Sequence, residues 1–331
     1  MSQERSITDL KGVYGLGIHS GIKVKGKDLS LIYIPEAVGS AGVFTRNQFS
    51  ASSVTYTRKI MKSNIVKAVV VNSGNANAGT GREGEKNTKL MARRMAHELG
   101  LNPSEVAVAS TGKIAVQLPM DAILSGITSL GGSKLEKKGD SIAEAILTTD
   151  LTKKTCWKDS KIGKKNIVVA GMTKGSGMIA PNMATTLSFI VTNASLDSDS
   201  LQLFLREAID DSFNMLSVDT DTSTNDLMLI FATGEYKFER TPLQDQAFQA
   251  LLTDQCIDLA KQIARDGEGA TTLIEMNVEG AASKKDARMI VKQIIESPLV
   301  KTAIYGQDPN WGRILAAASK NPDVKINPRK V

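Results

Sequence analysis

The stretch KGSGMIAPNMATTLSFIVT, Lys174 to Thr192, determines how the rest of the chain is interpreted. Its glycine-rich part leads through Pro181 to Ala184 and Thr185, and an apolar segment typical of a strand follows at once. A threonine that follows a small residue at the start of a strand is a suitable self-processing nucleophile. Ala-Thr pairs are also common for purely structural reasons, so the pattern alone leaves both interpretations open.

The chemistry expected of this junction is an autocatalytic cleavage. The Thr185 Oγ would attack the carbonyl carbon of Ala184, the peptide bond would become an ester, and water would release Thr185 as a new N-terminus. The freed α-amine has an ordinary pKa of roughly 7.7–8.0, which suits a general base near neutral pH. A threonine paired with its own terminal amine is a known nucleophile, and it suits a chain that contains 2 histidines.

Composition excludes several classes of protein. Hydrophobic residues make up 41% and charged residues 23% of the 331 residues, which is typical of a globular chain and not of a disordered or fibrous one. The net charge of +6 is dispersed and aromatics amount to 5%, which argues against a nucleic-acid partner. With 2 cysteines and 2 histidines, no zinc-ligand spacing occurs. No apolar run reaches the roughly 20 residues of a membrane span, and the first residues, MSQER, lack the basic-then-apolar layout of a secretory signal, so we expect a cytoplasmic location.

Strand-like and helix-like segments alternate, which predicts a mixed α/β class with sheets covered by helices. The expected strands are Ala41–Thr45, Val66–Asn72, Val106–Ser110, Asn166–Gly171, Leu187–Thr192, Leu227–Thr233 and Leu273–Val278. Helices are expected over Thr88–Leu99 with Gly100 as C-cap, from Ser200, from Thr241–Pro242 to Ala264, and from Ser283. The lysine-rich segment Thr152–Lys165 is predicted to be an exposed loop.

Two polar loops follow expected strands. In NSGNANAGTG, Asn72 to Gly81, small residues would let backbone amides face an anion, although a flexible connection is the plainer interpretation. In STGK, Ser110 to Lys113, Thr111 and Gly112 could offer a hydroxyl and an N–H to a developing oxyanion, and a structural turn is equally compatible.

Further polar segments lie in the second half of the chain. SVDTDTSTND, Ser217 to Asp226, could bind a cation or an amine, or simply form a hydrogen-bonded turn. In RDGEGATT, Glu268 could hold a substrate ammonium group or be a solvated loop residue. Trp311 and Arg313 of DPNWGR are interpreted as structural. His19 and His97 have no evident carboxylate partner, and His97 is expected to face solvent.

Together these segments resemble the bifunctional glutamate/ornithine N-acetyltransferase family of arginine biosynthesis. The resemblance runs from GIK at Gly21–Lys23 and VFTRN at Val43–Asn47 to DPNWGRILAA at Asp308–Ala317, and six motifs follow one another in the same order. It implies an N-terminal-nucleophile-like layered sandwich that cleaves itself between Ala184 and Thr185. The products would be chains 1–184 and 185–331, and two copies of each would form an α2β2 tetramer.

The resemblance also implies roles for particular residues. Thr185 would carry the acetyl group, and Thr111 and Gly112 would form the oxyanion hole. The amino-acid substrate would be bound by Thr148, Lys174, Thr185 and Glu268. Acetylornithine would acylate the threonine and glutamate would accept the acetyl group, with neither a metal nor a cofactor; whether acetyl-CoA also serves as donor is left open.

Some positions depart from the family pattern: Lys113 and Ala115 after STG, Leu151 and Lys153 after TTD, and Thr272 after DGEGAT. Family members usually continue for several tens of residues beyond the NWGR motif, so a C-terminal truncation is expected, as a fragment or as a divergent form. Two alternatives therefore stand beside acetyl transfer. They are a related self-cleaving aminopeptidase or amidase, and a truncated, non-catalytic member.

Overall fold

The computed structural model describes residues 5–180, 186–324, 326, 327 and 329. Sheet A contains four strands in the order β1-β2-β4-β5, of which β4 and β5 are parallel and the other neighbours antiparallel. Its strands are β1 (Tyr14–Ile18), β2 (Leu29–Tyr33), β4 (Ala68–Asn75) and β5 (Val106–Lys113).

Sheet B contains five strands in the order β3-β9-β8-β7-β6. These are β3 (Gly39–Phe44), β9 (Leu227–Lys237), β8 (Leu187–Ser195), β7 (Lys165–Lys174) and β6 (Lys154–Ile162). Only the pair β8 and β9 is parallel among its described neighbours. Parallel pairing brings the first residues of β8 and β9 to one edge, and antiparallel pairing brings the last residue of β7 to the same edge.

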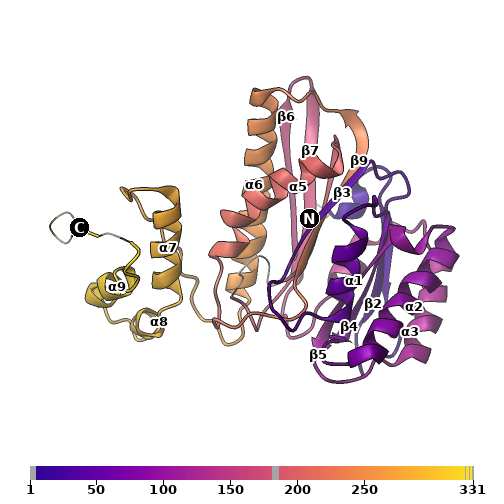
Figure 1. The fold of residues 1–331 in the computed structure, drawn as a ribbon, viewed down its shortest axis with the longest axis horizontal. Helices are drawn as coiled ribbons and strands as arrows, with labels where there is room; N and C mark the ends of the chain where they lie inside the picture. Colours follow the sequence, from indigo (N-terminus) through magenta and orange to yellow (C-terminus); the bar gives the residue numbers. More distant parts are fainter. Residues whose placement is uncertain (1–4, 181–185, 325, 328, 330–331) are drawn as a thin grey trace.

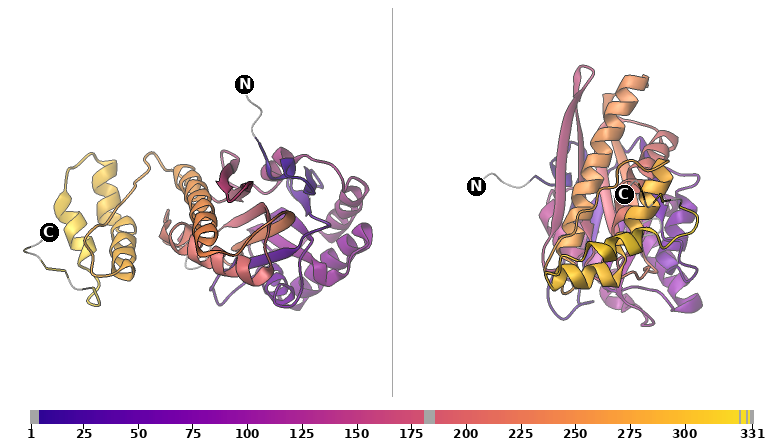
Figure 2. Two further views of the ribbon diagram at one scale, coloured as in Figure 1. Left: turned by 90° about the horizontal axis from the view of Figure 1, so that it is seen from above. Right: turned by 90° about the vertical axis from the view of Figure 1, so that its left-hand side faces the viewer.

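The two sheets face each other in a four-layer sandwich (Figures 1 and 2). One apolar core lies between the sheets and includes Val69 and Val71 from sheet A and Phe189 and Phe231 from sheet B. A second core packs the outer face of sheet A against α2 (Gly81–Leu99) and α3 (Met120–Gly132). A third packs the outer face of sheet B against α5 (Ser198–Asp210) and α6 (Pro242–Arg265). The predicted α/β class, with sheets covered by helices, is confirmed.

Predicted capping residues are found at the ends of two helices. The Thr241 side chain accepts a hydrogen bond from the Gln244 amide at the start of α6, with Pro242 in the first turn. Gly100 ends α2 in the left-handed conformation, with φ of 70°. Helix α5 starts earlier than predicted, because Asp197 rather than Ser200 is its N-cap.

Four segments differ from the prediction. Thr152–Lys165 is not an exposed loop, because most of it forms the edge strand β6, and its residue Lys154 is fully buried. Leu273–Val278 forms no strand and belongs to an extended connection. The strands β1 and β2 were not predicted. Two glycines interrupt β1, and β2 is a short run of five residues that are all buried, so neither strand shows the alternation that marks a half-buried strand.

After this connection the chain forms three helices, α7 (Lys284–Ile295), α8 (Pro298–Tyr305) and α9 (Trp311–Ala318), which lie to one side of the sandwich (Figure 1). Ser283 caps α7 as predicted, but of the apolar residues Ile290, Val291, Ile294 and Ile295, which its sequence pattern predicts to be buried, only Ile294 is. Trp311, expected to be structural, is 72% exposed. Among the described residues, no helix is long and apolar enough to cross a membrane. The remaining helices are α1 (Ser52–Ile60) and α4 (Gly139–Ala145), beside β5 and β1 respectively.

Candidate active site

The ends of five strands meet at one edge of the sandwich. Asn225, just before β9, bridges the two sheets there. Its Nδ2 donates to the carbonyl oxygen of Ala76 at 2.6 Å and to that of Ser110 at 2.7 Å. The loop that follows β4 and the strand β5 in sheet A are thereby held against the start of β9 in sheet B. The polar loops recognised in the sequence share this edge for that reason.

Thr111 and Lys174 lie in contact across the two sheets. Thr111 is near the end of β5, Lys174 is the last residue of β7, and the Lys174 Nζ lies 3.3 Å from the Thr111 Oγ1. Burial lowers the pKa of Lys174, whereas the carboxylates of Asp150 and Asp226 oppose that shift. The predicted oxyanion threonine and the predicted carboxylate-binding lysine therefore belong to one site.

Gly112 occupies a position that only glycine fits. Its φ is +131°, and a Cβ built there would lie 2.3 Å from the backbone carbon of Gly74 on the neighbouring strand β4. The two strands approach so closely here because their register shifts after Gly74. This close approach determines how the backbone N–H of Gly112 is presented beside Thr111.

A buried cluster of charged side chains is hydrogen-bonded to the segments that carry Thr148 and Lys174. The ammonium of Lys154 donates to Asp150, to Asp266 and to the carbonyl of Thr152, so each of its three protons has an acceptor. The Asp150 carboxylate also accepts from the backbone N–H of Gly175 at 2.7 Å and of Thr148 at 3.1 Å. Thr148 is thereby fixed to the segment that follows Lys174.

Asp150 itself is ionised in this setting. Burial acts to raise its pKa, but the nearby charges of Lys174 and Lys154 and the hydrogen bonds to the carboxylate outweigh it, so the pKa lies below its usual value. The Asp150 carboxylate therefore provides a fixed negative charge near Lys174.

Glu268 lies over the glycine-rich loop that follows β7. Its backbone N–H donates to the carbonyl of Ser176 at 3.0 Å, and a Cβ on Gly177 would come within 2.6 Å of the Glu268 carboxyl group. The glycine at position 177 thus leaves the room that this carboxylate occupies. Glu268 also acts electrostatically on Lys174, which places it in the same neighbourhood.

The structure therefore brings together Thr111, Gly112, Thr148, Lys174 and Glu268. The proposed nucleophile Thr185 and its neighbour Ala184 lie outside the described residues. The described chain resumes at Thr186, whose carbonyl accepts from the N–H of Leu227 at 2.9 Å. Among the described residues, no group of three or more His, Cys, Asp or Glu side chains is placed to hold a metal ion.

Several polar residues behave differently from the sequence interpretation. Asp219 of the acidic run accepts a hydrogen bond from the N–H of Asp221 at 3.0 Å, as in the hydrogen-bonded turn that was one of the two options. Its carboxylate also accepts from the backbone N–H groups of Met178 and Ile179. Asp226 at the end of that run is buried beside Lys174 and was not singled out. His19 does have a carboxylate neighbour, because its Nδ1 lies 3.2 Å from Asp28. His97 faces solvent as predicted, with its side chain 80% exposed.

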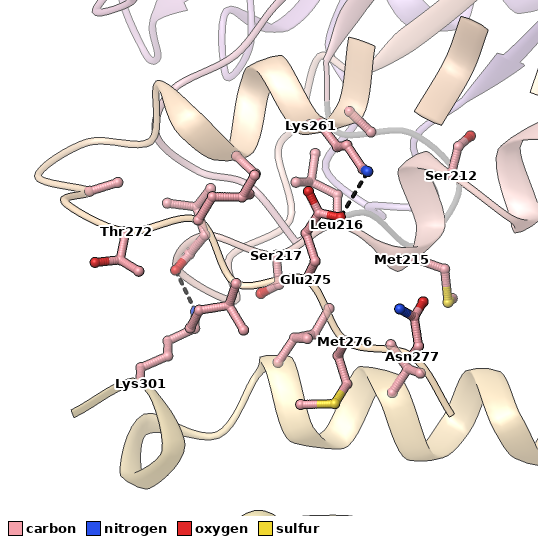
Figure 3. A pocket seen from close by; sticks show the side chains of 18 of the residues that line it. Ser212, Met215, Leu216, Ser217, Lys261, Thr272, Glu275, Met276, Asn277 and Lys301 are labelled. Atoms are coloured by element: carbon pink, nitrogen blue, oxygen red, sulfur yellow. Dashed lines mark hydrogen bonds and ion pairs between the residues drawn. The ribbon is translucent and has the colours of Figure 1, made fainter. Parts of the chain in front are cut away.

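A cavity of about 720 Å³ adjoins the site between the sandwich and the C-terminal helices. Glu268 lies on its rim, and its walls include Leu216, Met276 and Lys301 (Figure 3). The Lys301 Nζ donates to the carbonyl of Val218 at 2.6 Å, which ties α8 to the loop before β9. This volume falls within the range of small-molecule sites. Glu268 therefore lines this cavity and also belongs to the group of candidate site residues. Thr111 and Lys174 are not among the described residues that line the cavity.

Comparison with known proteins identifies relatives of this chain. The family model described as "ArgJ family" matches residues 15–331. The "Arginine biosynthesis bifunctional protein ArgJ" of Bacillus cereus (strain ATCC 10987 / NRS 248) is 45% identical over 331 residues, covering 98% of this chain and 81% of that protein. The protein of the same name from Gloeobacter violaceus is 46% identical over 321 residues, covering 95% and 79% respectively.

A solved structure gives the same result. The crystal structure of the arginine biosynthesis bifunctional protein ArgJ from Bacillus halodurans is 39% identical with a TM-score of 0.52, and the match covers 54% of this chain and 95% of that one. The family, the enzyme class and the arginine-biosynthesis function expected from the sequence are thereby confirmed. On the strength of a family match over nearly its whole length, the chain belongs to the ArgJ family.

Proposed function

We propose that this protein moves an acetyl group from N-acetylornithine to glutamate through an acetyl ester on Thr185. The observation that carries the proposal is the contact between Thr111 and Lys174 across the two sheets, at the edge where the described chain resumes at Thr186. In this proposal Thr111 is the oxyanion donor and Lys174 is the cation that binds the substrate carboxylate. The family membership supports the same reaction class.

The first half of the reaction acylates the threonine. The Thr185 Oγ attacks the acetyl carbonyl carbon while its own α-amine takes the hydroxyl proton. The Thr111 hydroxyl and the Gly112 N–H donate to the oxyanion that forms. As the tetrahedral intermediate collapses, the C–N bond breaks, the proton passes from the amine to the leaving nitrogen, and ornithine departs.

The second half reverses these steps with glutamate. The α-amine of glutamate attacks the ester carbon, its proton is taken by the α-amine of Thr185, and the C–O bond breaks to regenerate the hydroxyl. Lys174 holds the α-carboxylate as a cation in both halves, Glu268 as an anion holds the side-chain ammonium group of N-acetylornithine in the first half, and Thr148 contributes to the same substrate site. Ornithine and glutamate both carry an α-carboxylate, so one site serves both halves.

The nucleophile requires a free α-amine, so the proposal includes self-cleavage between Ala184 and Thr185. The products would be chains of 184 and 147 residues, which we propose assemble as an α2β2 tetramer in the cytoplasm. Mass spectrometry under denaturing conditions tests this directly. The folded wild-type chain should give two pieces, and Thr185→Ala should remain whole; an intact wild-type chain would contradict the assignment of the nucleophile.

Acetyl transfer is tested separately with N-acetylornithine and glutamate. Formation of N-acetylglutamate is expected, and acetyl-CoA is offered as a second donor in a parallel assay. Release of free acetate without N-acetylglutamate would instead indicate a hydrolase of the aminopeptidase or amidase kind, because water would then be the acceptor.

A further inference from the structure

Lys23, the last residue of the GIK motif, has no role in the proposed reaction, yet its side chain contacts two parts of the candidate site. Its stem covers Gly74, because a Cβ built on Gly74 would lie 2.7 Å from the Lys23 Cγ. The other side of the Gly74 backbone is the surface against which Gly112 packs. At the far end of the side chain, the Lys23 Nζ donates to the carbonyl oxygen of Leu147 at 3.0 Å, one residue before Thr148.

The loop that carries Lys23 is held in place by one buried carboxylate. Asp28 is 0% exposed, and its two oxygens accept from the consecutive backbone N–H groups of residues 20–23 at 2.6 to 3.1 Å. The backbone of Asp28 is itself fixed to sheet A, because its carbonyl accepts from the N–H of Ser73 on β4 at 2.8 Å. Sheet A therefore determines the point from which the Lys23 side chain extends.

The segment around Thr148 lies outside the regular structure. Helix α4 ends at Ala145, and residues 147–150 belong to neither a helix nor a strand. The Ser73 hydroxyl fixes the end of the helix by donating to the carbonyl of Ala145 at 2.5 Å. Beyond the helix, the position of Thr148 depends on hydrogen bonds from side chains of other segments.

Two such hydrogen bonds flank Thr148, and they come from different sheets. The Thr148 N–H donates to Asp150, whose carboxylate is bound to the N–H of Gly175 after β7 of sheet B. On the other side, the carbonyl of Leu147 accepts from Lys23, which extends from the loop fixed to sheet A. The candidate oxyanion hole belongs to sheet A and Lys174 to sheet B, so the Thr148 segment is tied to both halves of the site.

We propose that Lys23 is a positioning residue that holds Thr148 in register with the Gly112 oxyanion hole. Its ammonium sets the place of the Leu147 carbonyl, and its stem covers Gly74 behind Gly112. The inference rests on the proposed role of Thr148 in binding the amino-acid substrate. It predicts that the two ends of one side chain have separable effects, because the ammonium acts on substrate binding and the stem on the oxyanion hole.

The first test needs no substrate. Hydrogen exchange, followed by mass spectrometry of peptides that cover residues 146–151, reports how firmly the Thr148 segment is held. Lys23→Met keeps an apolar stem over Gly74 and removes the ammonium. Because a hydrogen bond from a charged donor is lost, we expect exchange in these peptides to become about tenfold faster. The control Lys27→Met removes an ion pair between the same loop and Glu144 of α4, and it should leave this exchange unchanged.

The second test separates KM from kcat in acetyl transfer from N-acetylornithine to glutamate. Lys23→Met should raise the KM for N-acetylornithine about tenfold and leave kcat within about twofold, because Thr148 loses its anchor while Gly74 stays covered. Lys23→Arg keeps a cationic donor and should restore the KM to within about threefold of the wild-type value. Lys23→Ala also uncovers Gly74, so it should lower kcat in addition.

The outcomes decide the proposal. Unchanged exchange around Thr148 in Lys23→Met, or a wild-type KM in that variant, overturns the positioning role, and so does a KM raised equally in Lys23→Arg. If Lys23→Met does not fold, Lys23→Gln takes its place, because its amide nitrogen is one bond short of the ammonium position. Absence of acetyl transfer in the wild type counts against the proposed function, while the exchange experiment still decides whether Lys23 holds the Thr148 segment.

Discussion

The buried ammonium of Lys154 gives the sharpest prediction about stability. Its side chain is 0% exposed and lies between Asp150, also 0% exposed, and Asp266, 6% exposed. Lys154→Met keeps the length of the side chain and removes the charge. Two buried carboxylates then lose their shared cation, and breaking a buried pair in this way costs about 3–5 kcal/mol. Asp150 keeps its two backbone N–H donors, so we expect a loss near the middle of that range, about 4 kcal/mol.

The assay is urea unfolding in the Thr185→Ala background, so that processing cannot differ between variants. Fluorescence of Trp157, on the same strand β6, reports the transition. The control is Lys153→Met at the adjacent residue. Lys153 pairs with Asp140 at the surface, where the two side chains are 40% and 71% exposed, so the expected cost is about 0–1 kcal/mol.

The pH dependence gives this prediction a second check. The pKa of Asp150 is lowered in the folded wild-type protein, so its contribution to stability is present above the unfolded value of about 3.9 and is lost as the pH falls below it. Without Lys154 the buried Asp150 loses one of the cations that lower its pKa, so its carboxylate protonates at higher pH. The deficit of the variant should therefore shrink as the pH falls from 7 toward 5. Equal unfolding free energies for Lys154→Met and Lys153→Met at pH 7 would refute the reasoning.

Three further results are expected. Gly112→Ala should lower stability by about 2 kcal/mol or more and reduce acetyl transfer, because its Cβ meets the Gly74 backbone at a φ of +131°; near-normal unfolding and turnover would contradict this. Gly177→Ala should change the unfolding free energy by less than about 1 kcal/mol but raise the KM for N-acetylornithine, because the new methyl group displaces only the end of the Glu268 side chain; an unaltered KM would be the opposing result. Burial raises the pKa of Cys156 to about 12, so iodoacetamide should label it slowly at pH 8 in the folded protein and rapidly in urea, and equal rates would show the thiol to be accessible and ionised.

Much of the fold could be predicted because its signals are local. The apolar runs that became β4, β5, β7, β8 and β9 lie in one continuous stretch each, and the caps at Thr241 and Gly100 act within a few residues. The strand β6 was missed for a physical reason. Its lysines suggest a solvated loop, but it is an edge strand whose outer face tolerates charge.

The candidate site, like the fold, could be predicted from the sequence only in part. The motifs around Thr111, Lys174 and Glu268 could be found because glycine and hydroxyl residues interrupt apolar strands there. Asp226 and Lys154 could not be recognised, since each looks like an ordinary charged residue until its surroundings are known. Their importance comes from burial, which depends on which distant segments cover them.

The amino-acid sequence by itself determined the α/β class, the order of the polar loops along the chain and the candidate nucleophile at Thr185, because these follow from periodicity and side-chain chemistry. Only the tertiary structure decided that the ends of β5 and β7 meet and that one lysine, Lys154, forms ion pairs with two aspartates. It also decided that Asp226 is enclosed beside Lys174. Contacts between sheets join residues far apart in sequence, and the dielectric surroundings that set a charge's behaviour exist only once those sheets have packed.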